Sequence, residues 1–149
     1  MKQLRYQISI HASVQEVWNT VLQPDTYKDW VAVSWPGSFY TGNWEKDASI
    51  RFISHNGSGT LARIKDIIPY NKINAEHIAV LHPGGIEDST SDLARGWTGT
   101  TEQYMFTERN NETVLQVDIH THPAWESMFD RGWPAALQQL KMICEKNHN

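Results

Sequence analysis

His77 is one of two candidates for a general acid or base that the sequence pattern singles out. In the alternating segment 72–82 it shares a face with small apolar residues, so its ring could line a cavity and orient a polar ligand. The alternative is a structural histidine whose ring is hydrogen-bonded or partly exposed. The sequence leaves both interpretations open.

Glu102 is the second acid–base candidate, because it shares a strand face with Tyr104 and Phe106. A carboxyl group beside aromatic side chains in a pocket can transfer protons. The alternative is an ion pair with Arg51 or Arg63. The sequence contains no phosphate-binding glycine loop, no nucleophile elbow and no HExxH motif, so we expect a binding protein rather than an enzyme.

Three potential metal ligands, Asp118, His120 and His122, alternate along a predicted strand and therefore share one face. The apolar residues that alternate with them in 115–119 must face the core, which leaves the Asp-His-His face in solvent. Side chains two residues apart on a strand are also widely spaced for tetrahedral zinc. We therefore expect neither a metal site nor another cofactor.

Aromatic residues are unusually frequent, with seven Trp, five Tyr and four Phe in 149 residues. Tryptophan buries a large area, and its N–H group needs a hydrogen-bond partner. The composition predicts either a tryptophan-rich core or an aromatic-lined cavity. Candidate lining residues are Trp30, Trp35, Tyr40, Trp44, Phe52, His77, Trp97, Tyr104, Trp125, Phe129 and Trp133.

Charge and cysteine content exclude several classes of protein. The formal net charge is −4, and no basic cluster favours nucleic acid or an anionic membrane. Cys144 is the only cysteine, so no internal disulfide forms, as in reducing compartments. The sequence has no signal-peptide pattern and no long apolar segment. We expect a cytoplasmic protein without membrane insertion.

The N-terminal third predicts a strand followed by two short helices. Residues 4–11 alternate between polar and apolar, as in a half-buried strand. Ser13 and Glu16 form a capping box ahead of an apolar stripe with helical spacing, in which Trp18 is a core anchor. Pro24 ends this helix and begins a second one, with Trp30 near its end.

The remaining sequence predicts consecutive strands and one long helix. Asn-Gly at 56–57 and Asn110-Asn111 favour tight hairpin turns, whereas 83–99 predicts a long irregular loop. Pro134 predicts a kink or a break in the last helix. The expected strands are 39–40, 48–55, 60–68, 72–82, 100–109 and 112–121, and the expected helical segment is 124–146.

This order of elements predicts a single α+β domain over residues 1–149. Strands joined by tight turns form an antiparallel sheet, and a long amphipathic helix must lay its apolar face on that sheet. The sheet has to curve around the helix. The gap between them is the natural place for a cavity.

The sequence resembles the START-like (SRPBCC) superfamily, and within it the bacterial branch similar to the C-terminal domain of the activator of heat-shock protein 90 ATPase. The segments that carry the resemblance are "ISIHASVQEVWNTV", "YKDW", "FYTGNW", "GSGTLARIKDIIP", "TEQYMFTERNNETVLQV" and "WPAALQQLKMICE". They cover nearly the whole chain. The resemblance implies a helix-grip fold, in which a curved antiparallel sheet of six or seven strands grips the C-terminal helix around a cavity.

The resemblance also frames three functional hypotheses. Members of the superfamily bind lipids, sterols, hormones or polyketide-like molecules, so the first hypothesis is a carrier or sensor of a small apolar or amphipathic ligand. The second is a protein-partner module, such as a chaperone cofactor. The third is a cyclase- or hydrolase-type enzyme that uses Glu102 or His77. No catalytic motif is common to the superfamily, and a monomer and a homodimer are both compatible with the sequence.

Overall fold

The computed structural model describes residues 1–146. The strands in this part of the chain are β1 (Lys2–Ile10), β2 (Phe39–Thr41), β3 (Ser49–Ile53), β4 (Gly59–Ile68), β5 (Lys72–His82), β6 (Ile86–Asp88), β7 (Thr101–Arg109) and β8 (Glu112–Thr121). The helices are α1 (Val14–Leu22), α2 (Pro24–Ala32), α3 (Asp92–Arg95), the 3-10 helix η1 (Pro123–Trp125) and α4 (Glu126–Lys146). None of these helices is long and apolar enough to cross a membrane.

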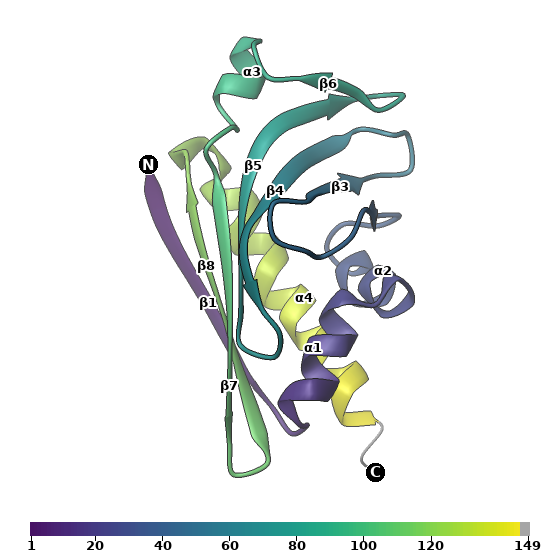
Figure 1. Cartoon of the computed structure of the whole chain (residues 1–149), viewed down its shortest axis with the longest axis vertical. Coiled ribbons are helices and arrows are strands. Elements are labelled where there is room, and N and C mark those ends of the chain that lie inside the picture. Colours follow the sequence, from purple (N-terminus) through teal and green to yellow (C-terminus); the bar gives the residue numbers. More distant parts are fainter. Residues whose placement is uncertain (147–149) are drawn as a thin grey trace.

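The strands form one antiparallel sheet in the order β1-β8-β7-β5-β4-β3-β2, and β6 pairs with β5. The sheet curves, and α4 runs along its inner side with α1 and α2 beside it (Figure 1). Two register shifts between β4 and β5 add to the bend, because an extra residue on one strand increases the local twist. The expected helix-grip architecture is therefore confirmed.

The predicted start of α1 is confirmed in detail. The Ser13 hydroxyl accepts the backbone N–H of Glu16 at 3.2 Å, which satisfies one of the donors left open at a helix N-terminus. Trp18 is buried and packs against Phe106, with ring centroids 5.1 Å apart. Pro24 stands at the first position of α2, where its missing N–H costs no hydrogen bond.

The long C-terminal helix continues through Pro134, so of the two predicted effects, a kink or a break, the break is wrong. Pro134 lies on the exposed side of α4, and the carbonyl that would accept its missing N–H belongs to Asp130, which is also exposed. Solvent can therefore satisfy that carbonyl, while the opposite side of the helix keeps its packing. The buried residues of α4 are Phe129, Gly132, Trp133, Ala136, Leu137, Leu140 and Cys144.

The segment 83–99 is more ordered than predicted, because it contains β6 and α3. The Asp88 carboxylate accepts the backbone N–H groups of Thr90 and Ser91 and the Ser91 hydroxyl. The same Ser91 hydroxyl caps α3 by accepting the N–H of Ala94 at 3.1 Å. The Ser- and Asp-rich composition that suggested a loop instead supplies turn and cap hydrogen bonds.

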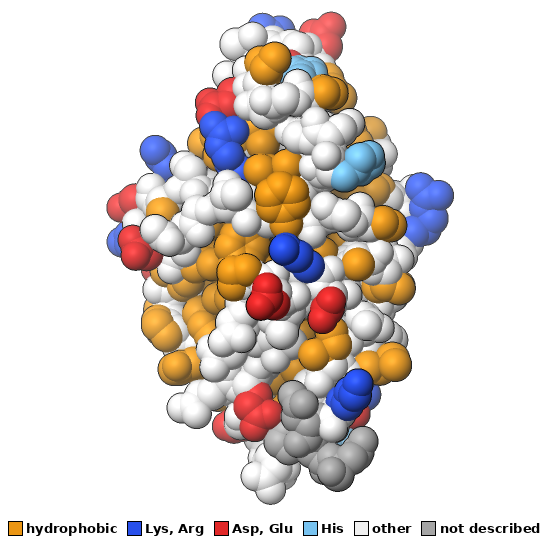
Figure 2. All heavy atoms as spheres, turned by 90° about the vertical axis from the view of Figure 1, so that its right-hand side faces the viewer, with side chains coloured by type: hydrophobic (Ala, Val, Ile, Leu, Met, Phe, Trp, Pro, Cys, Tyr) orange, Lys and Arg blue, Asp and Glu red, His pale blue; other side chains and the backbone are white. Residues whose placement is uncertain are grey.

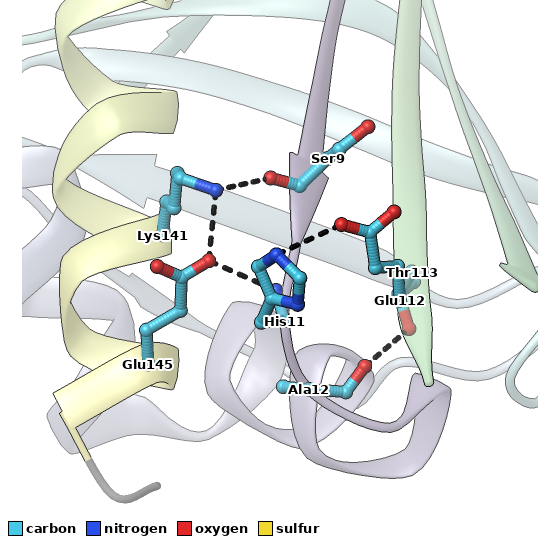
Figure 3. Close-up of polar contacts among 7 residues, drawn as sticks. All are labelled: Ser9, His11, Ala12, Glu112, Thr113, Lys141 and Glu145. Atoms are coloured by element: carbon cyan, nitrogen blue, oxygen red, sulfur yellow. Dashed lines mark hydrogen bonds and ion pairs between the residues drawn. The ribbon is translucent and has the colours of Figure 1, made fainter. Parts of the chain in front are cut away.

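Polar contacts attach the end of α4 to the end of β1 (Figure 3). Lys141 donates to the carbonyl of Ser9 at 2.6 Å and forms an ion pair with Glu145 at 2.8 Å. Glu145 also accepts the backbone N–H of His11 at 2.9 Å, and the His11 ring lies 2.9 Å from Glu112 at the start of β8. These contacts fix the C-terminal half of α4 against the sheet, while its N-terminal half borders the site described next.

Candidate functional site

A cavity of about 350 Å³ lies between the curved sheet and helices α2 and α4. The face of the molecule that carries α2 and β3 shows hydrophobic side chains in a band down its middle, with basic and acidic groups among them (Figure 2). The residues that line the cavity are Tyr27, Trp30, Val31, Trp35, Ser38, Phe52, Ile53, Ser54, Ser58, Gly59, Thr60, His77, Trp97, Glu102, Tyr104, Met128, Phe129 and Trp133.

Most of the lining residues expected from the sequence lie in this cavity. Those that do are Trp30, Trp35, Phe52, His77, Trp97, Tyr104, Phe129 and Trp133. Tyr40, Trp44 and Trp125 do not line it. They contact other elements or the residues of the wall instead. The Tyr40 hydroxyl donates to a carbonyl at the end of α1. Trp44 packs on Tyr40 and Phe52, and Trp125 packs on Trp97.

Several lining residues escaped the sequence analysis. Tyr27 precedes Trp30 by three residues, so helical spacing could have placed both on one face of α2. No such signal marks Ser54 and Ser58, which flank the β3–β4 turn and reach the cavity only because the sheet curves. The other unexpected residues are Val31, Ser38, Ile53, Gly59, Thr60 and Met128.

Trp133 of α4 is the centre of the aromatic wall. Its ring lies 5.9 Å from that of Trp30, 5.7 Å from that of Trp35 and 5.8 Å from that of Tyr104, measured between centroids. Trp35 approaches α4 so closely because its neighbour there is Gly132, where a Cβ atom would lie 2.4 Å from Trp35 Cζ2. A glycine in the middle of this helix therefore makes room for a tryptophan of the cavity wall.

Trp97, which follows α3, is also part of the cavity wall. Its ring stacks on Phe129 with centroids 5.9 Å apart and lies 4.8 Å from the ring of His77. The backbone N–H of His77 donates to Thr100 at 2.8 Å, and its carbonyl accepts from Gly99 at 3.0 Å. The segment that carries Trp97 is therefore bonded directly to the strand that carries His77.

Glu102 is the centre of the polar part of the wall. It accepts the Tyr104 hydroxyl at 3.0 Å through Oε2, and its Oε1 lies 3.5 Å from Nε2 of His77. Of the two arginines offered as alternative partners, Arg51 pairs with Glu87 at the sheet surface and Arg63 is exposed. Burial, and then the charge of Glu102, raise the pKa of Tyr27 and of Tyr104 well above the ordinary value.

Four nitrogen atoms of the cavity wall lack a hydrogen-bond partner. They are both ring nitrogens of His77 and the indole nitrogens of Trp97 and Trp133, and all four are shielded from solvent. Buried polar groups in proteins are nearly always hydrogen-bonded, because leaving one unpaired costs about 1–3 kcal/mol. These rings thus place unpaired donors in the wall of a mostly aromatic and apolar cavity.

Asp118, His120 and His122 do not line this cavity, and His122 lies beyond the end of β8, at the start of η1. Asp118 forms a 2.8 Å ion pair with Arg5 of β1, and His120 is exposed, whereas the alternating residues of 115–119 are buried as predicted. Within residues 1–146, no group of three His, Cys, Asp or Glu side chains is placed to hold a metal ion.

A curved antiparallel sheet that grips a long C-terminal helix, with a cavity between them, defines a helix-grip protein of the START-like class. The chain belongs to the family described as "Activator of Hsp90 ATPase homolog 1-like protein", whose model matches residues 11–145. The family resemblance drawn from the sequence is therefore confirmed.

Solved structures of low sequence identity share the fold. The solution structure of the Aha1 dimer from Colwellia psychrerythraea is 19% identical, covers 97% of each chain and has a TM-score of 0.73. A protein from Mesorhizobium loti is 10% identical, covers 97% of this chain and 98% of its own, and has a TM-score of 0.74. One from Nitrosomonas europaea is 12% identical, with coverage of 98% and 96% and a TM-score of 0.71. A comparison with curated proteins finds no match.

Proposed function

We propose that this protein binds a small apolar or amphipathic molecule, lipid-like or aromatic, in the cavity between the sheet and α4, as a carrier or sensor. One observation carries the proposal: the unpaired nitrogens of His77, Trp97 and Trp133 line an aromatic cavity of about 350 Å³. The volume lies within the usual range for small-molecule sites, roughly 300–1,000 Å³. Cavity binding is also common in this fold family, which supports the proposal.

Native mass spectrometry of the protein purified from its own host tests this proposal most directly. We expect a reproducible mass above that of the 17.1 kDa chain, and we expect it to be lost on denaturation. A library of lipids and aromatic compounds, screened by thermal shift, covers ligands that dissociate during purification. A bare chain by mass spectrometry, together with no shift in the melting temperature by any compound, contradicts the proposal.

A second candidate function, a protein-partner module, is favoured by the family description, which names the activator of Hsp90 ATPase. The relative from Colwellia psychrerythraea was solved as a dimer, which makes a homodimer the first assembly to test here. We expect a partner module to stimulate the ATPase of Hsp90 from the same host, and light scattering after size exclusion to report the oligomeric state. No stimulation at saturating protein contradicts the chaperone role.

A further inference from the structure

The polar part of the cavity wall narrows the class of ligand, on the assumption that the proposed binding function holds. We propose that the ligand carries a hydroxyl group on an aromatic ring, and that this hydroxyl lies beside Glu102 and His77. The hydroxyl group donates a hydrogen bond to Oε1 of Glu102 and accepts one from the N–H of His77 or Trp97. The cavity is then a site for phenol-type compounds rather than for hydrocarbons.

The acceptor in this arrangement is one oxygen of Glu102. The side chain is only 12% exposed, and its Oε2 is already occupied by the Tyr104 hydroxyl at 3.0 Å. Its Oε1 lies 3.5 Å from Nε2 of His77, which is longer than an ordinary N–H···O hydrogen bond of 2.7–3.2 Å. A buried carboxyl oxygen in this environment can accept a hydrogen bond from a further donor.

The donors are the nitrogens of His77 and Trp97. Neither ring nitrogen of His77 has a hydrogen-bond partner, so at least one unpaired N–H is present in every tautomer and charge state. The Trp97 indole N–H is also unpaired, and the two rings lie 4.8 Å apart. Since Nε2 of His77 and Oε1 of Glu102 are 3.5 Å apart, a single oxygen atom can lie within hydrogen-bond distance of both.

Only some functional groups of a ligand can hydrogen-bond both to the acceptor Glu102 and to the donors of His77 and Trp97. A hydroxyl donates one proton and accepts another, as the site requires, whereas a carbonyl has no proton for Glu102. An ammonium group has no lone pair for the indole N–H, and a carboxylate would be placed against the Glu102 carboxyl group. The rings around the polar groups favour an aromatic body: Phe52 lies 6.0 Å from His77, and Phe129 stacks on Trp97.

Two probes of nearly equal shape test the inference, 2-naphthol and 2-methylnaphthalene. Their dissociation constants are measured by titration calorimetry with the full-length protein. We expect 2-naphthol to bind at least about 10-fold more tightly, because the methyl analogue leaves Glu102 and His77 unpaired in the filled cavity. Both probes share the apolar body, so their ratio isolates the contribution of the hydroxyl group.

Three variants test whether Glu102 causes the difference in affinity between the two probes. We expect Glu102→Met, which removes both oxygens, to bring the ratio close to 1, and Glu102→Gln, which keeps one acceptor, to retain part of it. Glu76→Met is the matched control, because Glu76 lies on the neighbouring strand β5, is partly exposed and contacts Lys65 outside the cavity. We expect this control to keep the wild-type ratio. His77→Phe is a second test, because it removes the donor but keeps an aromatic ring beside Trp97.

The outcomes separate this inference from the function on which it rests. Equal affinity of the wild type for both probes, or an unchanged ratio in Glu102→Met and His77→Phe, overturns the hydroxyl assignment while cavity binding stands. No measurable binding of either probe to the wild type counts against both proposals. A preference for 2-naphthol that only the Glu102 and His77 variants lose supports the assignment.

Discussion

Burial and the charge of Glu102 together keep the neighbouring phenols of the cavity wall protonated. Desolvation is the larger cause and the Glu102 charge the second in raising the pKa of Tyr27 and Tyr104, so both phenols stay protonated at physiological pH. Protonated phenols can act as donors, and Tyr104 does so toward Glu102 at 3.0 Å. The wall is therefore rich in donors, with Glu102 as its main acceptor.

Removal of the Tyr104 hydroxyl tests this arrangement. We expect Tyr104→Phe to lower the free energy of unfolding by about 1 kcal/mol, because a buried hydrogen bond to Glu102 is lost. Tyr27→Phe is the matched control, since the described residues offer its hydroxyl no hydrogen-bond partner and we expect almost no effect. Urea unfolding of both variants gives the comparison, and equal losses would count against the role of the Glu102 contact.

Gly132 offers a second test at a single residue. Alanine normally stabilises a helix interior by roughly 0.5–1 kcal/mol relative to glycine. We expect the opposite here: Gly132→Ala places a Cβ 2.4 Å from Trp35 Cζ2 and destabilises the protein by about 1–3 kcal/mol, as overpacking does. Gly96→Ala is the control, because its Cβ would meet no atom closer than 3.5 Å. Urea unfolding distinguishes the two, and a stabilised Gly132→Ala contradicts the packing.

Elements with strong periodicity could be predicted from the sequence almost residue by residue. The segment 72–82 alternates over its whole length and forms β5 with those bounds, and the capping residue Ser13 marks the start of α1 correctly. Pro134 does not break α4, because its effect depends on which side of the helix it occupies, and that follows from tertiary packing. Local hydrogen bonds of Asp88 likewise turned an expected loop into β6 and α3.

The site was predictable to the extent that large aromatic residues signalled it. Trp30 and Trp133 line the cavity as the composition suggested, whereas Trp44 and Trp125 resemble them in sequence but lie behind the wall. Residue type reports that a side chain is buried. Whether it faces the core or the cavity depends on the curvature of the sheet, which no local pattern encodes.

The attachment of α4 to β1 is an element-scale feature that depends on pH. Hydrogen bonds from His11 and Lys141 lower the pKa of Glu145 from 4.5. A depressed pKa means that the folded state favours the charged form, so this stabilisation is fully present above the ordinary pKa and is lost as the pH falls through the lower folded pKa. We expect Glu145→Gln to cost less than about 1 kcal/mol at pH 7, since the carboxylate is partly exposed.

The pH dependence supplies the check on Glu145. Urea unfolding of the wild type and Glu145→Gln at pH 7 and pH 3.5 should give a smaller difference at the lower pH, because pH 3.5 lies below the ordinary pKa of 4.5 and the stabilisation from the charged form diminishes there. Glu87→Gln serves as a surface control, because its partner Arg51 holds it at an exposed position. A difference between wild type and Glu145→Gln that is the same at both pH values would be evidence against the contact.

At the scale of the whole molecule, the two halves of α4 have different roles. The C-terminal half is fixed to the sheet through Lys141 and Glu145, and the N-terminal half supplies Phe129 and Trp133 to a space that its own side chains leave open. Space of this kind contributes no packing energy to the unliganded protein. The fold thus combines a closely packed end with an end that borders a cavity.

A substitution that fills the cavity tests whether the N-terminal half of α4 borders a binding space. We expect Val31→Phe to weaken binding of 2-naphthol at least about 10-fold, because the larger side chain occupies the space that the probe needs. The melting temperature of the free protein should stay the same or rise, since the added ring replaces empty volume. Val33→Phe is the control, because Val33 is 55% exposed and does not line the cavity. Unchanged affinity in Val31→Phe places the probe elsewhere.

The tryptophans differ in the hydrogen bonding of their indole N–H groups, so their NMR signals can report where a ligand binds. The indole N–H groups of Trp30 and Trp125 are bonded to backbone carbonyls, whereas those of Trp97 and Trp133 are not. Hydrogen bonding moves an indole proton resonance downfield. A ligand that accepts a hydrogen bond from Trp97 or Trp133 therefore shifts the signal of that residue and leaves the signals of Trp30 and Trp125 nearly in place. A simple nitrogen-15 spectrum of the indole region therefore tells, without any chemical label on the ligand, whether the ligand contacts Trp97 or Trp133.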